Sequence, residues 1–161
     1  MVNLNQKDLL LLSFLRDNSR EKLTTISRKT GIPISTIFDR LKDFNKKEIR
    51  KFSCIVDFSK LGFPIKTKIL IKVNSHEREE LEKYLNRNEK VNSLFKINNG
   101  YNFLIEGIFK SLKESENFVE KLEKRYVIEN IQSFYVLNEI KRESFNFLHN
   151  NKVIIKNSGF L

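Results

Sequence analysis

Apolar residues in the first part of the chain recur with helical spacing. A leucine stripe predicts a first helix over residues 5–17, and Asn5 and Asp8 are spaced as a capping box at its start. Residues 23–30 predict a second, shorter helix that ends at Gly31, because glycine is the usual residue just past a helix. Two short helices joined by tight turns are therefore expected before the third.

A third helix is predicted from Pro33 to residue 47. Ile37, Leu41 and Phe44 follow at i, i+4 and i+7, so they form one buried stripe. At about 100° of rotation per residue, polar and basic residues lie on the opposite side, with an aromatic and an arginine on the flanks. These outward positions are Ser35, Asp39, Lys42 and Lys46, with Phe38 and Arg40 on the flanks.

The pattern changes to alternation after this helix. In residues 49–58 (IRKFSCIVDF) the odd-numbered positions alternate with the even-numbered ones as two faces. This pattern predicts strand structure with a turn inside it. Cys54 lies in this run and is expected to be a buried structural thiol. Three helices followed by a strand pair are typical of a winged helix-turn-helix.

The second half predicts a ferredoxin-like domain, so the fold class is α+β. Gly62 and Pro64 mark a boundary before it. The expected order is βαββαβ, an antiparallel sheet with both helices on one face. Its predicted strands are 65–73, 91–97, 101–109 and 131–137, its helices are 75–87 and 111–125, and Asn98-Asn99-Gly100 forms a hairpin turn. Ser75 is expected to cap the first helix, and Leu112, Phe118, Val119 and Leu122 to form the apolar side of the second.

The resulting domain plan has four parts. They are a winged helix-turn-helix at 1–50, a strand and hinge at 51–63, the ferredoxin-like domain at 64–141 and a C-terminal extension at 142–161. In the extension, Phe145, Phe147 and Leu148 suggest a short helix, and residues 153–155 an extra strand.

Charge adds a preference for polyanionic partners. The chain has 30 Lys and Arg against 20 Asp and Glu, a net charge of +10, and its pI is near 9.7. Residues 1–60 carry 13 basic and 7 acidic side chains, a net of +6, whereas the longer remainder has a net of +4. This balance favours nucleic acid or an acidic membrane surface, with higher charge density over the predicted helix-turn-helix.

Several classes of site and location find no support in the sequence. One cysteine excludes an internal disulfide and a multi-cysteine zinc site, and His76 and His149 have no ligand partners at useful spacing. No nucleophile–base pair or glycine-rich phosphate loop is present. We therefore predict no catalytic residues, metal or cofactor. No apolar run reaches the ~18 residues of a membrane span and no secretory signal precedes the first helix, so a cytoplasmic location and no membrane partner are expected.

Four segments resemble one protein family when taken together. They are LNQKDLLLLSFLRDNSR, ISRKTGIPISTIFDRLKDF, IVDFSKLGF and NNGYNFLIEGIF, and the likeness runs from Asn5 to Lys141. In this combination the chain resembles the feast/famine regulators, the leucine-responsive regulator/AsnC (Lrp/AsnC) family. The resemblance implies a DNA-binding transcription regulator that forms dimers or assemblies of dimers. It also implies that the second domain pairs subunits through its sheet and binds an amino acid between them.

Particular positions match or depart from the family pattern. The matches are Gly31, Ser35-Thr36-Ile37, Arg40, Asp57, Leu61-Gly62 and Tyr101. Pro33-Ile34 replaces the usual Ser-Pro, Lys47-Glu48 stands where a glycine ends the recognition helix, and Asn102 replaces an aspartate after the hairpin tyrosine. Because a neutral amide holds an amino group more weakly than a carboxylate does, Asn102 argues against an ordinary amino-acid effector.

We predict two groups of DNA contacts on the third helix and beyond. A helix in the major groove reads bases with short donors and acceptors near its N-terminus, while basic residues hold phosphates. The predicted base-reading residues are Ser35, Thr36, Phe38 and Asp39, and the predicted phosphate-binding residues are Arg40, Lys42, Lys46, Lys47, Arg50 and Lys51. For Arg40, an ion pair with a neighbouring acid is an equal alternative.

The hairpin is the predicted effector site. Asn99, Gly100, Tyr101 and Asn102 are its candidate residues. The alternative is turn chemistry, because Asn and Gly tolerate positive φ.

The sequence therefore predicts a sequence-specific regulator that binds double-stranded DNA as a homodimer or an assembly of dimers, with an effector as a further partner, and that is not an enzyme. A siroheme decarboxylase-like enzyme on the same two-domain plan is the alternative, although that class is richer in pocket histidines. An RNA-binding ferredoxin-like module is a third, but the strands lack its aromatic pattern.

Overall fold

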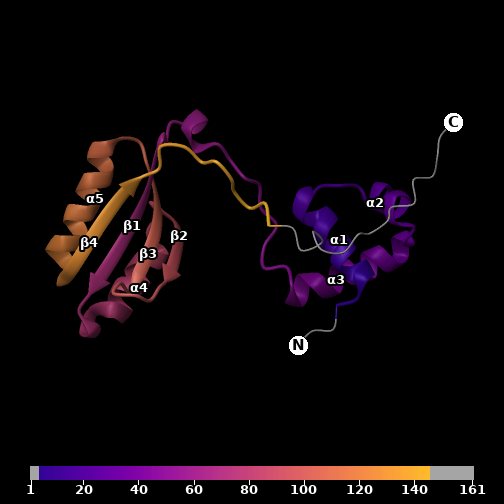
Figure 1. Ribbon diagram of the computed structural model, residues 1–161, viewed down its shortest axis with the longest axis horizontal. Coiled ribbons are helices and arrows are strands. Elements are labelled where there is room, and N and C mark those ends of the chain that lie inside the picture. The colour runs from indigo at the N-terminus through magenta and orange to yellow at the C-terminus, as the bar shows by residue number, and fades with distance from the viewer. Residues whose placement is uncertain (1–3, 146–161) are drawn as a thin grey trace. The chain divides into compact units, whose positions relative to one another are not determined.

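The computed structural model describes residues 4–145 of the chain (Figure 1). Its contacts divide the chain into two units. The first takes in the chain up to Ile55 together with the segment that begins at Lys141, and the second is Val56–Ile140.

The first unit contains the three predicted helices. They are α1 (Gln6–Asp17), α2 (Leu23–Thr30) and α3 (Ile34–Lys47). The capping box at the start of α1 is present, since Asp8 N donates to Asn5 Oδ1 and Asn5 N donates to Asp8 Oδ2. Gly31 ends α2 with φ of 71°, a left-handed conformation that glycine adopts without a Cβ penalty.

One apolar cluster holds these helices together. Its buried members are Leu11, Leu15, Ile26, Ile32, Ile37 and Phe44. The stripe of α3 is as predicted, with Ile37 and Phe44 buried and Leu41 packed against them. On α1 the most buried leucine is Leu11, which lies beside the predicted stripe.

The strand predicted over residues 49–58 is wrong. Residues 49–57 lie in no helix or strand, and a short 3-10 helix, η1 (Phe58–Leu61), follows. Cys54 is exposed, so the predicted buried thiol is also wrong. Alternation alone does not bury a run. A strand needs a neighbouring strand to complete its ladder, and the described chain supplies none here.

The second unit has the predicted βαββαβ order. Its elements are β1 (Ile65–Val73), the 3-10 turn η2 (Ser75–Glu77), α4 (Arg78–Arg87), β2 (Val91–Lys96), β3 (Phe103–Phe109), α5 (Leu112–Arg125) and β4 (Ile128–Tyr135). The four strands form one sheet in the order β2-β3-β1-β4, with every neighbouring pair antiparallel (Figure 1). The fold is therefore α+β.

Both helices of this unit pack on the same face of the sheet. Alternate residues of β1 (Ile69, Ile71 and Val73) are fully buried in one cluster. Leu81 and Leu85 of α4 join it, as do Phe118 and Leu122 of α5. Neither helix covers the opposite face of the sheet.

Three local predictions in this unit were wrong. Asn74 caps the first turn after β1, since its Oδ1 accepts from His76 N, and Ser75 lies inside that turn. Leu112 is 48% exposed, whereas Ser115, one turn further on, is buried. The last strand begins at Ile128, earlier than predicted, because β4 pairs with β1 from Val73 onward.

The C-terminal predictions fall mostly beyond the described chain. The predicted strand at 153–155 and the helix residues Phe147 and Leu148 lie outside the described residues, and Phe145 lies in no helix. Within residues 4–145, no helix is long and apolar enough to cross a bilayer.

Gly107 lies where a side chain would collide with the core. A Cβ at this position of β3 would lie 2.5 Å from Cε2 of Phe109, which is itself fully buried. We expect Gly107→Ala to lower the free energy of unfolding by about 1–3 kcal/mol, because the ring has no space to retreat into. Urea unfolding measures the loss. Adding Phe109→Leu should recover part of it, and a double variant that is no more stable than Gly107→Ala would contradict the collision.

Candidate nucleic-acid interface

Helix α3 has one buried side and one exposed side. Ile37 and Phe44 are 0% and 2% exposed, whereas Phe38 is 50% exposed on the other side. The four predicted base-reading residues, Ser35, Thr36, Phe38 and Asp39, are all exposed and lie in its first two turns. The helix is therefore held by its inner stripe and presents these side chains outward.

The N-terminus of α3 lacks a side-chain cap. Pro33 occupies the cap position, where its carbonyl accepts from Ile37 N at 3.0 Å, and no side chain accepts from the first turn. The replacement of the usual Ser-Pro by Pro33-Ile34 thus leaves this helix end without a capping hydroxyl. Backbone N–H groups at such a helix end are donors suited to an anion.

Five basic side chains extend from the outer side of α3 into the following segment. They are Lys42, Lys46, Lys47, Arg50 and Lys51, and all are exposed. In the part of the chain that the structure describes, none of the five forms an ion pair. Lys42 Nζ instead lies 4.5 Å from the ring centroid of Phe38. By contrast, several lysines of the second unit, such as Lys68 and Lys72, are paired with glutamates.

Arg40 forms the ion pair that the sequence left as an alternative. Its Nε lies 3.3 Å from Oδ1 of Asp8, whose side chain is only 5% exposed. Asp8 therefore both caps α1 and links it to α3. The Arg40 side chain remains 47% exposed, which leaves its outer guanidinium edge accessible.

We expect Asp8→Ala to destabilise the first unit by about 2 kcal/mol, since it removes a helix cap and leaves Arg40 without its carboxylate. The matched control is Asp17→Ala, which removes an exposed carboxylate from the last turn of the same helix. Urea unfolding compares them. Equal midpoints for the two variants would show that the Asp8 contacts contribute little.

The junction after residue 55 contains a second capped turn. Asp57 Oδ1 accepts from Ser59 N at 3.1 Å and from Ser59 Oγ at 2.6 Å. The hydrogen bond from the Ser59 side chain holds the pKa of Asp57 below its ordinary value, so this carboxylate stays charged at neutral pH.

The hairpin residues have clear structural roles. Asn99 and Gly100 adopt positive φ of 62° and 91°, which fits the turn-chemistry alternative. Asn102 Oδ1 accepts from Val73 N at 2.8 Å, so its carbonyl is bound to β1. Tyr101 is half-buried beside them.

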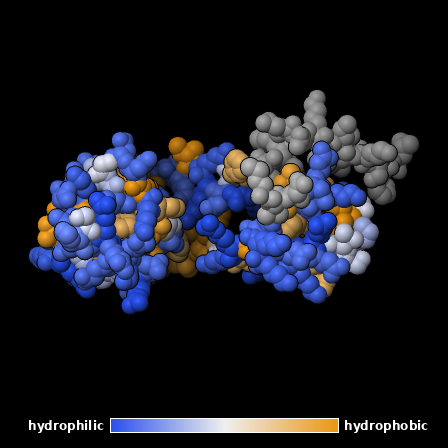
Figure 2. Space-filling model, turned by 90° about the horizontal axis from the view of Figure 1, so that it is seen from below, coloured by the Kyte–Doolittle hydropathy of each residue, from blue (hydrophilic) through white to orange (hydrophobic). Residues whose placement is uncertain are grey.

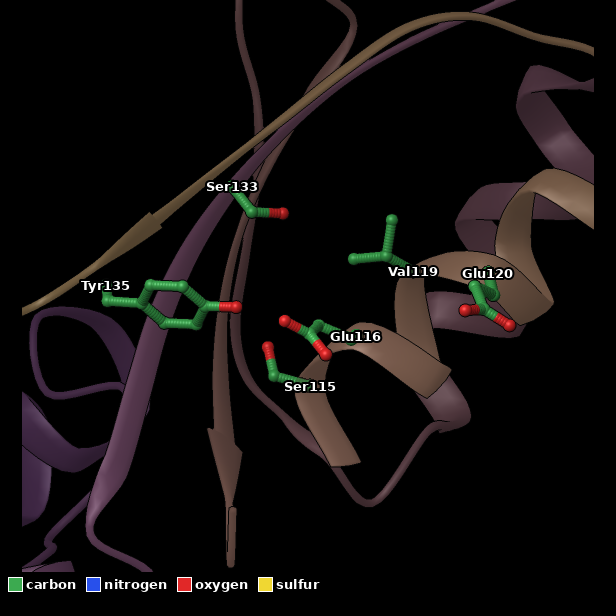
Figure 3. A pocket seen from close by; sticks show the side chains of 6 residues that line it. All are labelled: Ser115, Glu116, Val119, Glu120, Ser133 and Tyr135. Carbon is green, nitrogen blue, oxygen red and sulfur yellow. The ribbon is translucent and has the colours of Figure 1, made fainter. Parts of the chain in front are cut away.

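A separate open cavity lies between α5 and β4. It has a volume of about 310 Å³ and is lined by Ser115, Glu116, Val119, Glu120, Ser133 and Tyr135. Figure 3 shows the oxygens of Ser115, Glu116, Ser133 and Tyr135 directed toward a common space, with Glu120 turned away. Because Tyr135 pairs with Thr67 and Phe103 pairs with Ile71, this cavity and the hairpin lie toward opposite ends of β1. No sequence pattern indicated this cavity, because it forms only where α5 packs beside β4.

The uncovered face of the sheet carries apolar side chains around a polar group. Leu104 lies opposite Leu70 on one side and Phe95 on the other, so these three share the face. Phe134 lies opposite Lys68 and is 53% exposed. Among them, Glu106 pairs with Lys68 at 2.7 Å and accepts from Asn92 Nδ2. In the view of Figure 2 the surface is mostly hydrophilic with separate hydrophobic patches, so a face with four large apolar residues is a distinctive feature.

Residues 4–145 contain no cluster of side chains that could bind a metal ion. No group of three or more His, Cys, Asp or Glu side chains there is arranged to hold a metal ion. His76 is exposed in η2, and His149 lies outside the described residues.

The second unit matches a known family. Residues 68–144 match the Lrp/AsnC ligand binding domain. An uncharacterized HTH-type transcriptional regulator of Pyrococcus furiosus, PF1231, is 30% identical over 131 residues, which cover 81% of this chain and 87% of the relative. The HTH-type transcriptional regulator FL11 of Pyrococcus abyssi is 27% identical over 141 residues, covering 87% and 93%.

Solved structures share the fold over nearly the whole chain. The transcriptional regulator NMB0573 of Neisseria meningitidis, solved as a complex with L-Met, superposes with a TM-score of 0.83 at 20% identity, covering 91% of this chain and 98% of that one. PH0061 superposes with a TM-score of 0.78 at 26% identity, covering 90% and 100%.

Proposed function

Because the chain belongs to the Lrp/AsnC family of HTH-type transcriptional regulators, we propose that it recognises specific sequences in double-stranded DNA and does so as a dimer or an assembly of dimers. Its relatives are named as regulators of transcription, which favours this function over the decarboxylase alternative. We place this activity in the cytoplasm, with no membrane partner.

The exposed side of α3 carries the proposal. Ser35, Thr36 and Asp39 offer short donors and acceptors in its first two turns, and the exposed Phe38 ring suits a thymine methyl. The uncapped helix end and the unpaired basic residues from Lys42 to Lys51 provide phosphate contacts beside them. In this assignment the first unit is a helix-turn-helix reading head, in which the described residues do not form the strand pair predicted as a wing.

Dimerisation is assigned to the uncovered face of the sheet. Two copies packed through Leu70, Phe95, Leu104 and Phe134 would remove this apolar surface from water. Two-fold pairing of the second units then brings two reading heads to one site. We expect a pseudo-palindromic site with half-sites about one helical turn, ~10 bp, apart or a multiple of it.

Effector control is assigned to the second unit as well. The Neisseria relative is a complex with L-Met, and we propose that this chain also responds to a small molecule at the hairpin formed by Asn99, Gly100, Tyr101 and Asn102. Because the side-chain oxygen of Asn102 already accepts from Val73 N, this side chain offers a ligand mainly its amide N–H groups. An effector with an acceptor at that position fits better than a free amino group.

A gel-shift series tests the DNA-binding proposal. The protein is titrated against genomic fragments, beginning with its own promoter, at several salt concentrations. We expect a few fragments to bind at least ~1,000-fold more tightly than the rest at physiological salt. Equal affinity for all fragments across the salt series would refute base reading by α3.

A further inference from the structure

A second open cavity lies between α4 and the last turn of α5. It has a volume of about 390 Å³ and is lined by Glu80, Lys83, Tyr84, Arg87, Asn88 and Arg125. The first four stand at i, i+3, i+4 and i+7 of α4, so they share one side of that helix. The cavity shares no residue with the hairpin or with the cavity beside Tyr135, so it is a separate candidate site.

Positive charge and hydrogen-bond donors dominate this lining. It holds three cationic side chains and one carboxylate, a net charge of +2. Arg87 is exposed and forms no ion pair or side-chain hydrogen bond with another described residue. Asn88 Oδ1 accepts from Lys90 N at 3.0 Å, which leaves the Asn88 amide N–H groups for a ligand. Such a lining suits an anion with several acceptor oxygens.

Two tyrosine rings hold the guanidinium group of Arg125 in place. Its Cζ lies 4.9 Å from the ring centroid of Tyr84 and 5.4 Å from that of Tyr126, which is only 4% exposed. Arg125 Nη2 also lies 3.4 Å from Glu80 Oε1, while the Arg125 side chain remains 55% exposed. A guanidinium that is already positioned loses less conformational entropy when it binds a ligand.

We propose that this cavity binds a small phosphate monoester, with the phosphate group between Arg87 and Arg125. A phosphate monoester carries about −1.5 to −2 charges at pH 7, which matches the net charge of the lining, whereas a carboxylate carries one. The planar forks of two guanidinium groups match phosphate oxygens. The site is independent of the effector site assigned to the hairpin, so either assignment can fail alone.

Lys83 supplies the third cation. Its Nζ lies 2.5 Å from Oε1 of Glu79, but both side chains are well exposed, at 64% and 80%. An exposed ion pair at i, i+4 contributes only about 0.3–0.5 kcal/mol, so Lys83 can turn from Glu79 to the ligand at little cost.

Calorimetry of the full-length protein without DNA tests the proposal, with glycerol 3-phosphate as the probe. We expect saturable binding at one site per chain, with an affinity about tenfold or more above that of acetate, which has a single charge. Glycerol alone should not bind. Absence of saturable binding by glycerol 3-phosphate, or equal affinity for acetate, would overturn the proposal.

A pair of arginine variants on α4 locates the site. We expect Arg87→Gln to weaken binding of glycerol 3-phosphate by about tenfold or more, because hydrogen bonds to a charged group are lost. Arg78→Gln makes the same change in the first turn of the same helix, outside the cavity, and should leave the affinity unchanged. Equal weakening by the two variants would mean attraction by diffuse charge and would overturn the site.

The DNA backbone offers the same phosphate chemistry, and a gel shift separates the two sources. A small ligand suits a concave cavity, so we expect Arg87→Gln to leave DNA affinity and its salt dependence unchanged. If the cavity instead holds a DNA phosphate in each subunit of a dimer, the slope of log K against log salt would become shallower by about 1.8. That result would overturn the assignment to a small molecule.

Discussion

Replacing Lys46 and Lys47 by alanine is expected to weaken binding to every DNA sequence by about 1,000-fold at 0.15 M salt. Both lysines are exposed in the last turn of α3, and neither forms an ion pair in the described chain. If each holds one phosphate, the dimer loses four contacts. Each contact releases about 0.9 counterion, which corresponds to roughly a fivefold loss per contact at this salt concentration.

The salt dependence separates this explanation from a loss of fold. The slope of log K against log salt should become shallower by about 3.6 when four phosphate contacts are lost. The matched control is Lys113→Ala/Lys121→Ala, which removes the same charge from exposed positions of α5. We expect it to leave both the affinity and the slope nearly unchanged. A changed base preference in the Lys46/Lys47 variant would instead make these lysines base-reading residues.

The helices were predictable because their signals are local. The capping box of Asn5 and Asp8, the glycine after α2 and the i, i+4, i+7 stripe of α3 all act within a few residues. The same holds for β1, which has the predicted bounds and buries alternate residues. Local chemistry therefore predicted where most elements begin and end.

The junction was not predictable for a different reason. Residues 49–58 alternate as well as β1 does, but β1 has a strand on each side and the junction has none in the described chain. Alternation predicts which residues share a face, but it does not predict whether a neighbouring strand pairs with the segment. The exposure of Cys54 follows from this missing neighbour.

The candidate site was likewise predictable only where its signals are local. Helical spacing alone was enough to place Ser35 and Asp39 on the exposed side of α3, with Phe38 on its flank. The sequence left the partner of Arg40 undetermined, because it cannot show that Asp8 of α1 lies 3.3 Å from Arg40 of α3. The cavity beside Tyr135 likewise depends on how α5 packs beside β4, which no local pattern predicts.

Leu104→Glu is expected to abolish the dimer and, with it, tight binding to a two-half-site operator. Leu104 lies on central strand β3 between Leu70 and Phe95, on the sheet face that neither helix covers. In the proposed dimer, two symmetric carboxylates would be buried there without partners. An unpaired buried charge costs about 3–5 kcal/mol, so the dimer dissociation constant should rise by about 10,000-fold or more.

DNA binding should fall with the dimer, because each reading head would then bind its half-site alone. Loss of the linked second head typically lowers affinity by about 100- to 10,000-fold without any change in the DNA contacts. The matched control is Leu112→Glu, since Leu112 is 48% exposed at the start of α5, where a glutamate suits the helix N-terminus. Sedimentation and gel shift measure both variants, with circular dichroism to confirm folding. A folded Leu104→Glu protein that remains dimeric would show that the copies pair through another surface, while a monomer with unchanged operator affinity would show that the two heads act independently.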